Sequence, residues 1–266
     1  MRIRQITIAC LLTAVLSSAW LQSASASEAE TAADNQTESS SEDTADLKVK
    51  PINLASTDEK RPAYKALDYV PISNEDYKSI TFSAYPPADD SEAAQTAYQT
   101  MVDTNIMTQL YQLYPVKSYP DGMLSYIENG LKNTYEQYAQ LYGMSLNSFL
   151  QTYLKLDTGT FREQVKEAAK KTLTQELLLR AVAEKENITV SDSEYEKGLS
   201  DYASAYGYES ADALKKDYDE DTIRVSLLMD KTIRFLEQNA KIVTILETET
   251  ETETETLTET ELSAQQ

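Results

Sequence analysis

The sequence predicts an all-α fold, and three observations lead to that prediction. Between about residues 90 and 238, apolar side chains recur every three to four positions, which is the spacing of one helix face. Capping sequences and single glycines interrupt this pattern where helices would begin and end. A short motif ending in Tyr-Gly also occurs twice. Helices are therefore expected over about residues 90–114, 121–142, 145–155, 160–187, 192–206, 210–217 and 220–238.

The expected helices each carry one apolar face. In the helix of residues 121–142, that face consists of Leu124, Ile127, Leu131, Tyr135, Tyr138 and Tyr142. Such a stripe must be buried against another element, so the helices should pack together around a shared core.

Residues at the expected helix ends satisfy backbone groups that a helix leaves unpaired. Thr160-x-x-Glu163 and Ser191-x-x-Glu194 have the form of capping boxes at two helix starts. Gly143 and Gly207 each follow a tyrosine at a helix end, where glycine enters the left-handed region at little cost. Two acidic groups, Glu194 with Glu196 and Asp219 with Glu220 and Asp221, could form an acid–base dyad. Helix starts favour anions, so a capping role is preferred and no catalytic residue is expected.

The two glycine corners belong to an internal repeat. Residues 138–143 read Tyr-Ala-Gln-Leu-Tyr-Gly, and residues 202–207 read Tyr-Ala-Ser-Ala-Tyr-Gly. Each motif precedes a short expected helix that carries Leu150 or Leu214. The pattern predicts two helical hairpins, each with its own apolar seam; chance similarity between amphipathic helices is the alternative.

Composition excludes several classes of site. The chain has no histidine, and its single cysteine, Cys10, lies in the apolar leader. Beyond the leader, disulfides, thiolate catalysis and Cys- or His-ligated metals are therefore not expected. The six glycines are scattered singly, so no phosphate-binding loop is present and neither a nucleotide nor another cofactor is expected.

Charge is strongly acidic, with 44 Asp and Glu against 24 Lys and Arg and a net charge of −20. Much of the excess lies in residues 27–60 and 247–266, which flank the helical region. A surface of this sign repels phosphate backbones and anionic lipids, so nucleic acid and membrane surfaces are not expected as partners.

The amino terminus predicts export. Residues 1–26 contain a basic start, an apolar run from Ile6 to Leu16 and the sequence Ala24-Ser25-Ala26, which together form a secretory signal peptide. An uncleaved membrane anchor is the alternative, although the apolar run is shorter than the ~20 residues that span a bilayer. The apolar run continues through Cys10, which argues against lipid modification. The expected location is secreted or extracytoplasmic, with membrane contact only through an uncleaved leader.

The rest of the chain divides by composition. Residues 27–60 are rich in Ser, Glu and Thr and predict a disordered spacer, because they bury too little apolar surface to fold. Residues 61–88 are expected to form an extended lead-in, and residues 89–246 the helical domain. Residues 247–266 alternate Glu and Thr and predict a solvated tail, with weak calcium binding as the alternative.

The span from about Tyr119 to Val243 resembles the carboxy-terminal chaperone domain of trigger factor, whose fold is shared with the SurA and PrsA chaperones. The resemblance is carried by residues 138–145, 160–165, 181–190 and 235–241, which are Tyr-Ala-x-x-Tyr-Gly-Met-Ser, Thr-Phe-Arg-Glu-Gln-Val, Ala-Val-Ala-Glu-Lys-Glu-Asn-Ile-Thr-Val and Phe-Leu-x-x-Asn-Ala-Lys. Upstream, residues 66–70 and 76–78 are similar to the family's lead-in to its isomerase domain.

The resemblance implies a two-armed helical domain that holds non-native chains. No basic ribosome-contact motif is recognisable, and the stretch from Arg61 to Lys117 is too short for the family's β-rich isomerase domain. The expected function is an ATP-independent extracytoplasmic holdase with unfolded polypeptides, and no ribosome, as partners. Two alternatives remain: a proline isomerase by family membership, and a surface binding or assembly module with one dedicated partner.

Aromatic and methionine side chains on the arms are the expected client contacts. Such side chains offer large amphipathic surfaces that adapt to varied partners. Core packing between helices is the alternative for each of them. The candidate residues are Met123, Tyr126, Tyr135, Tyr138, Tyr142, Tyr153, Tyr202 and Tyr206.

Overall fold

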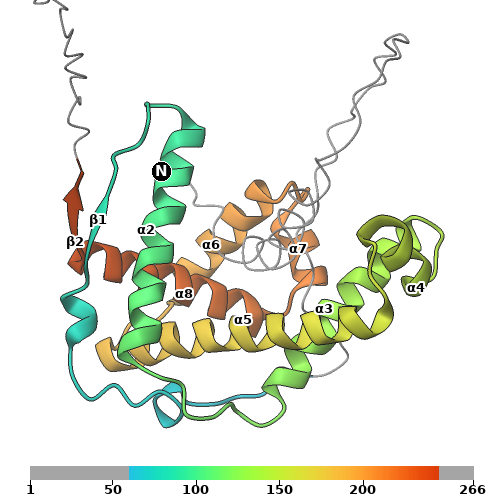
Figure 1. Ribbon diagram of the computed structural model, residues 1–266, viewed down its shortest axis with the longest axis horizontal. Coiled ribbons are helices and arrows are strands. Elements are labelled where there is room, and N and C mark those ends of the chain that lie inside the picture. Colours follow the sequence, from blue (N-terminus) through green and yellow to red (C-terminus); the bar gives the residue numbers. More distant parts are fainter. Residues whose placement is uncertain (1–59, 246–266) are drawn as a thin grey trace, which may run out of the picture.

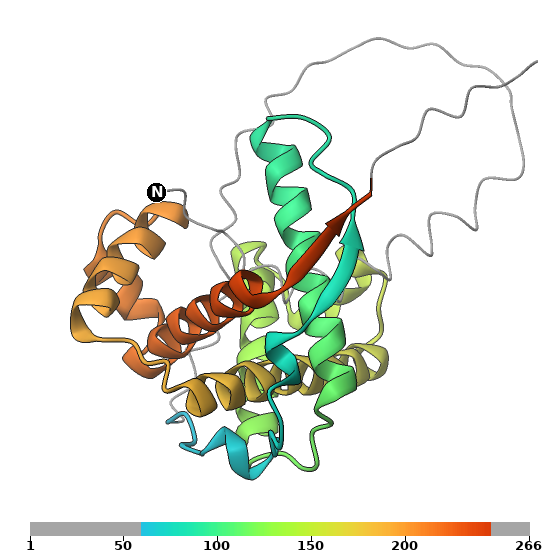
Figure 2. The same ribbon diagram turned by 90° about the vertical axis from the view of Figure 1, so that its left-hand side faces the viewer.

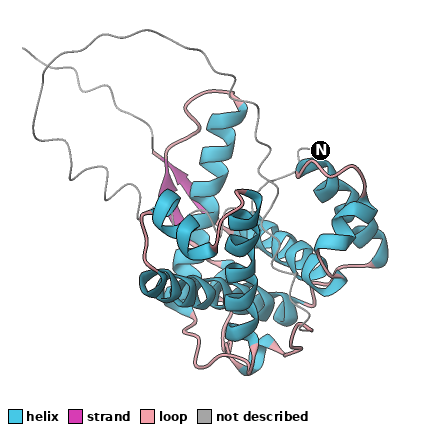
Figure 3. Ribbon diagram, turned by 90° about the vertical axis from the view of Figure 1, so that its right-hand side faces the viewer, coloured by secondary structure: helices cyan, strands magenta, loops and turns pink. Residues whose placement is uncertain are grey.

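The computed structural model describes residues 60–245, so the predicted leader and the Glu/Thr tail lie outside it (Figure 1). The predicted all-α class is confirmed, since nearly all the regular structure is helical (Figure 3). The helices are α2 (Glu92–Leu113), α3 (Met123–Leu141), α4 (Leu146–Phe149), α5 (Thr158–Glu186), α6 (Asp192–Ala205), α7 (Ala211–Asp217) and α8 (Glu220–Asn239). No helix among the described residues is long and apolar enough to cross a bilayer.

The long helix α5 is the axis of the fold. Helices α3 and α8 and the 3₁₀ turn η1 (Ala66–Asp68) all pack against it (Figure 1). Its buried face continues for several turns and includes Leu173, Leu177 and Val182, none of which is accessible to solvent. This stripe is the centre of the main core, to which the lead-in, α2, α3 and α8 also contribute.

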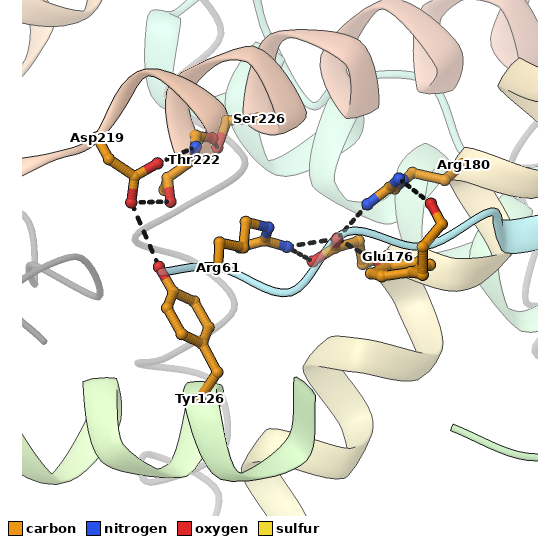
Figure 4. Close-up of polar contacts among 8 residues, drawn as sticks. Arg61, Tyr126, Glu176, Arg180, Asp219, Thr222 and Ser226 are labelled. Carbon is orange, nitrogen blue, oxygen red and sulfur yellow. Dashed lines mark hydrogen bonds and ion pairs between the residues drawn. The ribbon is translucent and has the colours of Figure 1, made fainter. Parts of the chain in front are cut away.

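The lead-in is fastened to α5 by a buried carboxylate. The guanidinium group of Arg61 donates hydrogen bonds to both carboxylate oxygens of Glu176, and Arg180 and the Tyr64 hydroxyl donate one each (Figure 4). The side chains of Arg61 and Glu176 are only 9% and 6% exposed. Arg180 also donates to the backbone oxygen of Tyr64 at 3.0 Å and stacks over its ring. The lead-in therefore belongs to the folded body.

Two further acids of α5 hold the same segment. The carboxylate of Glu184 accepts hydrogen bonds from the backbone N–H groups of Ala66 at 2.7 Å and Leu67 at 3.0 Å, at the start of η1. Glu186 accepts a hydrogen bond from the hydroxyl of Tyr77 and forms an ion pair with Lys78 at 2.8 Å. Acids spaced along one helix thus bind successive parts of the lead-in.

The structure also contains a pair of short parallel strands, of which the second was not predicted. Strand β1 (Thr81–Ala84) lies within the extended lead-in expected over residues 61–88, but its partner β2 (Lys241–Thr244) lies directly after α8. The register pairs Thr81 with Lys241 and Ala84 with Thr244. β-branched residues favour a strand at 242–245, yet the pairing joins segments far apart in the chain, which local patterns do not specify.

One of the two expected capping boxes is confirmed. Ser191 accepts the N–H of Glu194, and the Glu194 side chain accepts the N–H of Ser191. The box at Thr160 is wrong, because α5 begins earlier, with Asp157 as its cap. The Asp157 carboxylate accepts the N–H groups of Gly159 at 2.8 Å and Thr160 at 3.0 Å. It therefore satisfies the donors that the predicted box would have served.

The two glycine corners have the same geometry. Gly143 has φ of +64°, and the N–H of Met144 donates to Ala139 across the end of α3 at 2.8 Å. Gly207 has φ of +71°, and the N–H of Tyr208 donates to Ala203 across the end of α6, also at 2.8 Å. The repeat seen in the sequence therefore encodes two equivalent helix terminations.

We predict that Glu176→Gln destabilises the protein by about 3 kcal/mol or more, because it leaves two buried guanidinium groups without their counter-charge. Urea denaturation measures the loss. Glu163→Gln is the matched control, since it removes an exposed ion pair with Lys166 and should leave the midpoint unchanged. Equal midpoints for both variants would contradict a stabilising role for the buried cluster.

Candidate functional site

The most exposed apolar surface of the described residues lies at the tip of the first arm. Leu141, Tyr142 and Tyr153 are 80%, 54% and 44% exposed, and together they form what we call the tip patch. Leu141 ends α3, and Tyr153 lies in the π-helical turn η3 (Leu150–Leu154) that follows α4. Figure 1 shows this tip at the end of α5 farthest from β1 and β2.

A stack of aromatic rings supports the tip patch. Phe149 is buried at the centre, with its ring centroid 5.7 Å from that of Tyr142 and 5.2 Å from that of Tyr153. The two tyrosine rings are 4.9 Å apart. The Gly143 corner turns the chain back, so that residues of α3, α4 and η3 meet there. The buried ring therefore holds the two tyrosines in place while their outer surfaces stay open to solvent.

The second arm, formed by α6, α7 and the start of α8, has its aromatic residues inside. Tyr195, Tyr202 and Tyr218 pack around Leu199 and Leu214 in a separate core. The Tyr202 hydroxyl donates to Asp230 of α8 at 2.6 Å, and burial raises the pKa of Tyr202 well above its ordinary value. These rings join α6 and α7 to α8 and offer little surface to a partner.

The other residues predicted to contact clients are buried or half-buried. Met123 and Tyr126 lie in the main core, and the Tyr126 hydroxyl donates to Asp219 at 3.3 Å (Figure 4). Tyr135 is half-buried, with its ring edge-on to that of Phe161 at 5.1 Å. Half-buried positions are also found for Tyr138 and Tyr206.

Leu141 is the residue that the prediction missed. It is more exposed than any of the candidate tyrosines, yet it follows Tyr138 by three positions and so fits the helical apolar pattern. That pattern indicates burial and gives no sign that the core ends before the last turn of α3. Phe149, the support of the patch, was assigned only to a short helix.

One acid of each group at a helix start acts as a cap, Glu194 at α6 and Asp219 at α8. Asp219 caps α8 by accepting the N–H of Thr222 at 2.7 Å. A cavity of about 310 Å³ beside it is lined by Asp192, Glu196, Asp219 and Glu220, together with Lys215, Arg224 and two tyrosines. Arg224 donates to Asp192 at 2.8 Å and to Glu220 at 2.6 Å, so cations already neutralise part of this cluster.

The chain is similar in sequence to one known protein family. The family model described as the bacterial trigger factor C-terminus matches residues 90–238. Trigger factor of Caldicellulosiruptor saccharolyticus is 35% identical over 122 residues, which cover 45% of this chain and 26% of that protein. Trigger factor of Anoxybacillus flavithermus is 35% identical over 125 residues, covering 47% and 29%.

Trigger factor of Lachnoclostridium phytofermentans is 28% identical over 172 residues, covering 64% of this chain and 38% of that protein. The chain thus spans about a quarter to two fifths of the length of these curated relatives. No solved structure gives a significant match.

We predict that Glu194 titrates with a pKa of about 2 in the folded protein. A hydrogen bond from Lys231 lowers this pKa most, followed by hydrogen bonds from Ser191. Because the folded pKa is below the ordinary value of 4.5, the stabilisation is complete above pH 4.5 and is lost as the pH falls toward 2.

The stability difference between wild type and Glu194→Gln should therefore be present at pH 6 and absent near pH 2. Thermal unfolding at the two pH values measures it, and carboxyl chemical shifts report the pKa itself. A difference that does not change with pH would show that the Lys231 and Ser191 contacts do not act on the charged form.

Proposed function

Because this chain belongs to the family of the bacterial trigger factor C-terminus, we propose that it is an ATP-independent chaperone that holds unfolded or newly exported polypeptides outside the cytoplasm. The observation that carries this proposal is the tip patch. Three large apolar side chains are exposed together at the end of an arm, where they contribute little to the core. A patch of this kind marks a surface that binds other chains.

The chemistry of the patch suits varied and weakly bound clients. Tyr142 and Tyr153 present aromatic faces with polar hydroxyls, so they accept both apolar and polar neighbours. Their rings are already held by Phe149, so little side-chain freedom is lost on binding. One small patch gives modest affinity, and a long unfolded chain that also meets other surfaces of the protein would be held by their combined effect.

The sequence supports the rest of the proposal. The predicted signal peptide at residues 1–26 directs the chain out of the cytoplasm, where ATP is not supplied. Binding alone requires no nucleotide, and the chain has no glycine-rich phosphate loop. The strong negative charge keeps the chaperone soluble while it carries an aggregation-prone client.

We predict that the triple variant Leu141→Ser, Tyr142→Ser, Tyr153→Ser needs about tenfold more protein to suppress aggregation to the same extent, a difference of about 1.4 kcal/mol in client binding. Light scattering of several unrelated denatured proteins diluted into buffer measures the effect. Because the two tyrosine rings pack on buried Phe149, the melting temperature should fall by a few degrees, and protection is therefore compared at a temperature where both proteins are fully folded.

Leu113→Ser is the matched control, since Leu113 is an exposed leucine of α2 outside the patch. It should protect as well as the wild type. Full protection by the triple variant would contradict the assignment of the site. Protection of only one of the test proteins would favour the dedicated-partner alternative, and acceleration of a proline cis/trans assay would favour the isomerase.

A further inference from the structure

Strand β2 has an unpaired edge. The N–H groups of Lys241 and Ile245 donate to Ile80 and Ala84, both at 2.8 Å, so the odd-numbered residues of β2 face β1. Because backbone groups alternate in direction along a strand, the N–H groups of Ile242 and Thr244 point to the opposite edge. The sheet has two strands among residues 60–245, so no third strand in that range occupies this edge.

The other edge of the sheet is covered. The side chain of Gln109 in α2 donates to the backbone oxygen of Thr81 at 3.0 Å, and Ala84 is buried. Figure 1 shows β1 between α2 and β2, and Figure 2, viewed from that side, shows β2 with no described element in front of it. Strand β2 contains no proline that would block pairing. Within residues 60–245, the outer edge of β2 is therefore the edge of this sheet to which another strand could pair.

The exposed face of the sheet beside this edge carries Thr81, Ser83, Lys241 and Val243, of which Val243 is the large apolar side chain. Paired residues share a face, so Val243 lies beside Ser83, and Tyr85 follows on the same side. Val243 is 45% exposed and Tyr85 is 57% exposed. An added strand would place every second side chain on the face that carries Val243, so a segment with alternating apolar residues fits best.

Charge around the sheet decides what can bind there. Strand β1 leads into Asp89, Asp90 and Glu92, all exposed, and these three acids outnumber Lys241, the exposed cation of β2. A second copy of this chain, with its own net charge of −20, would be repelled. A segment that carries lysine or arginine is instead attracted.

We infer that the β2 edge binds an extended client segment as a third strand, and that it favours segments with alternating apolar side chains flanked by Lys or Arg. This inference rests on the proposed holding function and adds to it a second site with its own sequence preference. Main-chain hydrogen bonds would supply affinity for any extended segment, while Val243, Tyr85 and the acids that follow β1 would supply the preference.

The test measures binding of a fluorescent peptide, Lys-Lys-Val-Thr-Val-Thr-Val-Lys-Lys, to the protein without its leader. Thr244→Pro removes one outward N–H and leaves the donors to β1 intact, so it should weaken binding at least tenfold with little change in melting temperature. Thr244→Val keeps the N–H and should bind like the wild type. A peptide with Glu in place of Lys, and one with N-methylated alternate amides, should both bind at least tenfold more weakly.

Equal binding by Thr244→Pro and the wild type would overturn the inference. If Thr244→Pro fails to fold, the N-methylated peptide decides on the wild-type protein, and unchanged affinity for it overturns the inference. Absent peptide binding with intact, tip-dependent aggregation suppression would overturn the strand site and leave the proposed function standing. Peptide binding without aggregation suppression would instead contradict the proposed holding function.

Discussion

The buried carboxylate of Glu176 ties the lead-in to the central helix through three side chains. Burial alone would raise its pKa, but the charges and hydrogen bonds of Arg61, Arg180 and Tyr64 outweigh that cost and hold the pKa below its ordinary value. The Arg61 guanidinium also lies over the ring of Tyr126, 5.5 Å from its centroid, so the cluster reaches α3. One ionised group thus fixes the lead-in and the central helix in a single arrangement.

That arrangement determines which side chains are free for function. The lead-in, α2 and α8 pack along α5 and bury the apolar side chains of its carboxyl-terminal half. Near the amino-terminal end of α5, Phe161 packs against Tyr135 of α3, and Figure 1 shows the first arm there, away from α2 and the β-strands. Too few neighbours remain there to cover every apolar side chain, so Leu141, Tyr142 and Tyr153 stay exposed around Phe149. The exposed surface at the tip is a consequence of where the core ends.

Much of the helical framework could be read from local chemistry. Each expected helix has a counterpart, and Gly143, Gly207 and the Ser191 box mark ends that the structure confirms. Those signals act over a few residues, which is why one sequence reveals them. The start of α5 was misplaced because Thr160 and Asp157 are both good caps, and the choice between them depends on how the preceding turn is built. Strand β2 was missed because its partner lies at the other end of the domain.

For this protein, the sequence by itself determined the all-α class, the hairpin repeat and the kind of side chain at the arms, because periodicity and capping are local properties. Tertiary structure alone decided that Tyr206 is half-buried beside Tyr202, while Tyr142, its counterpart in the repeat, is exposed at the tip. It also decided that, within residues 60–245, one edge of β2 has no neighbouring strand. Exposure depends on how many neighbours reach a residue, and those neighbours come from distant parts of the chain.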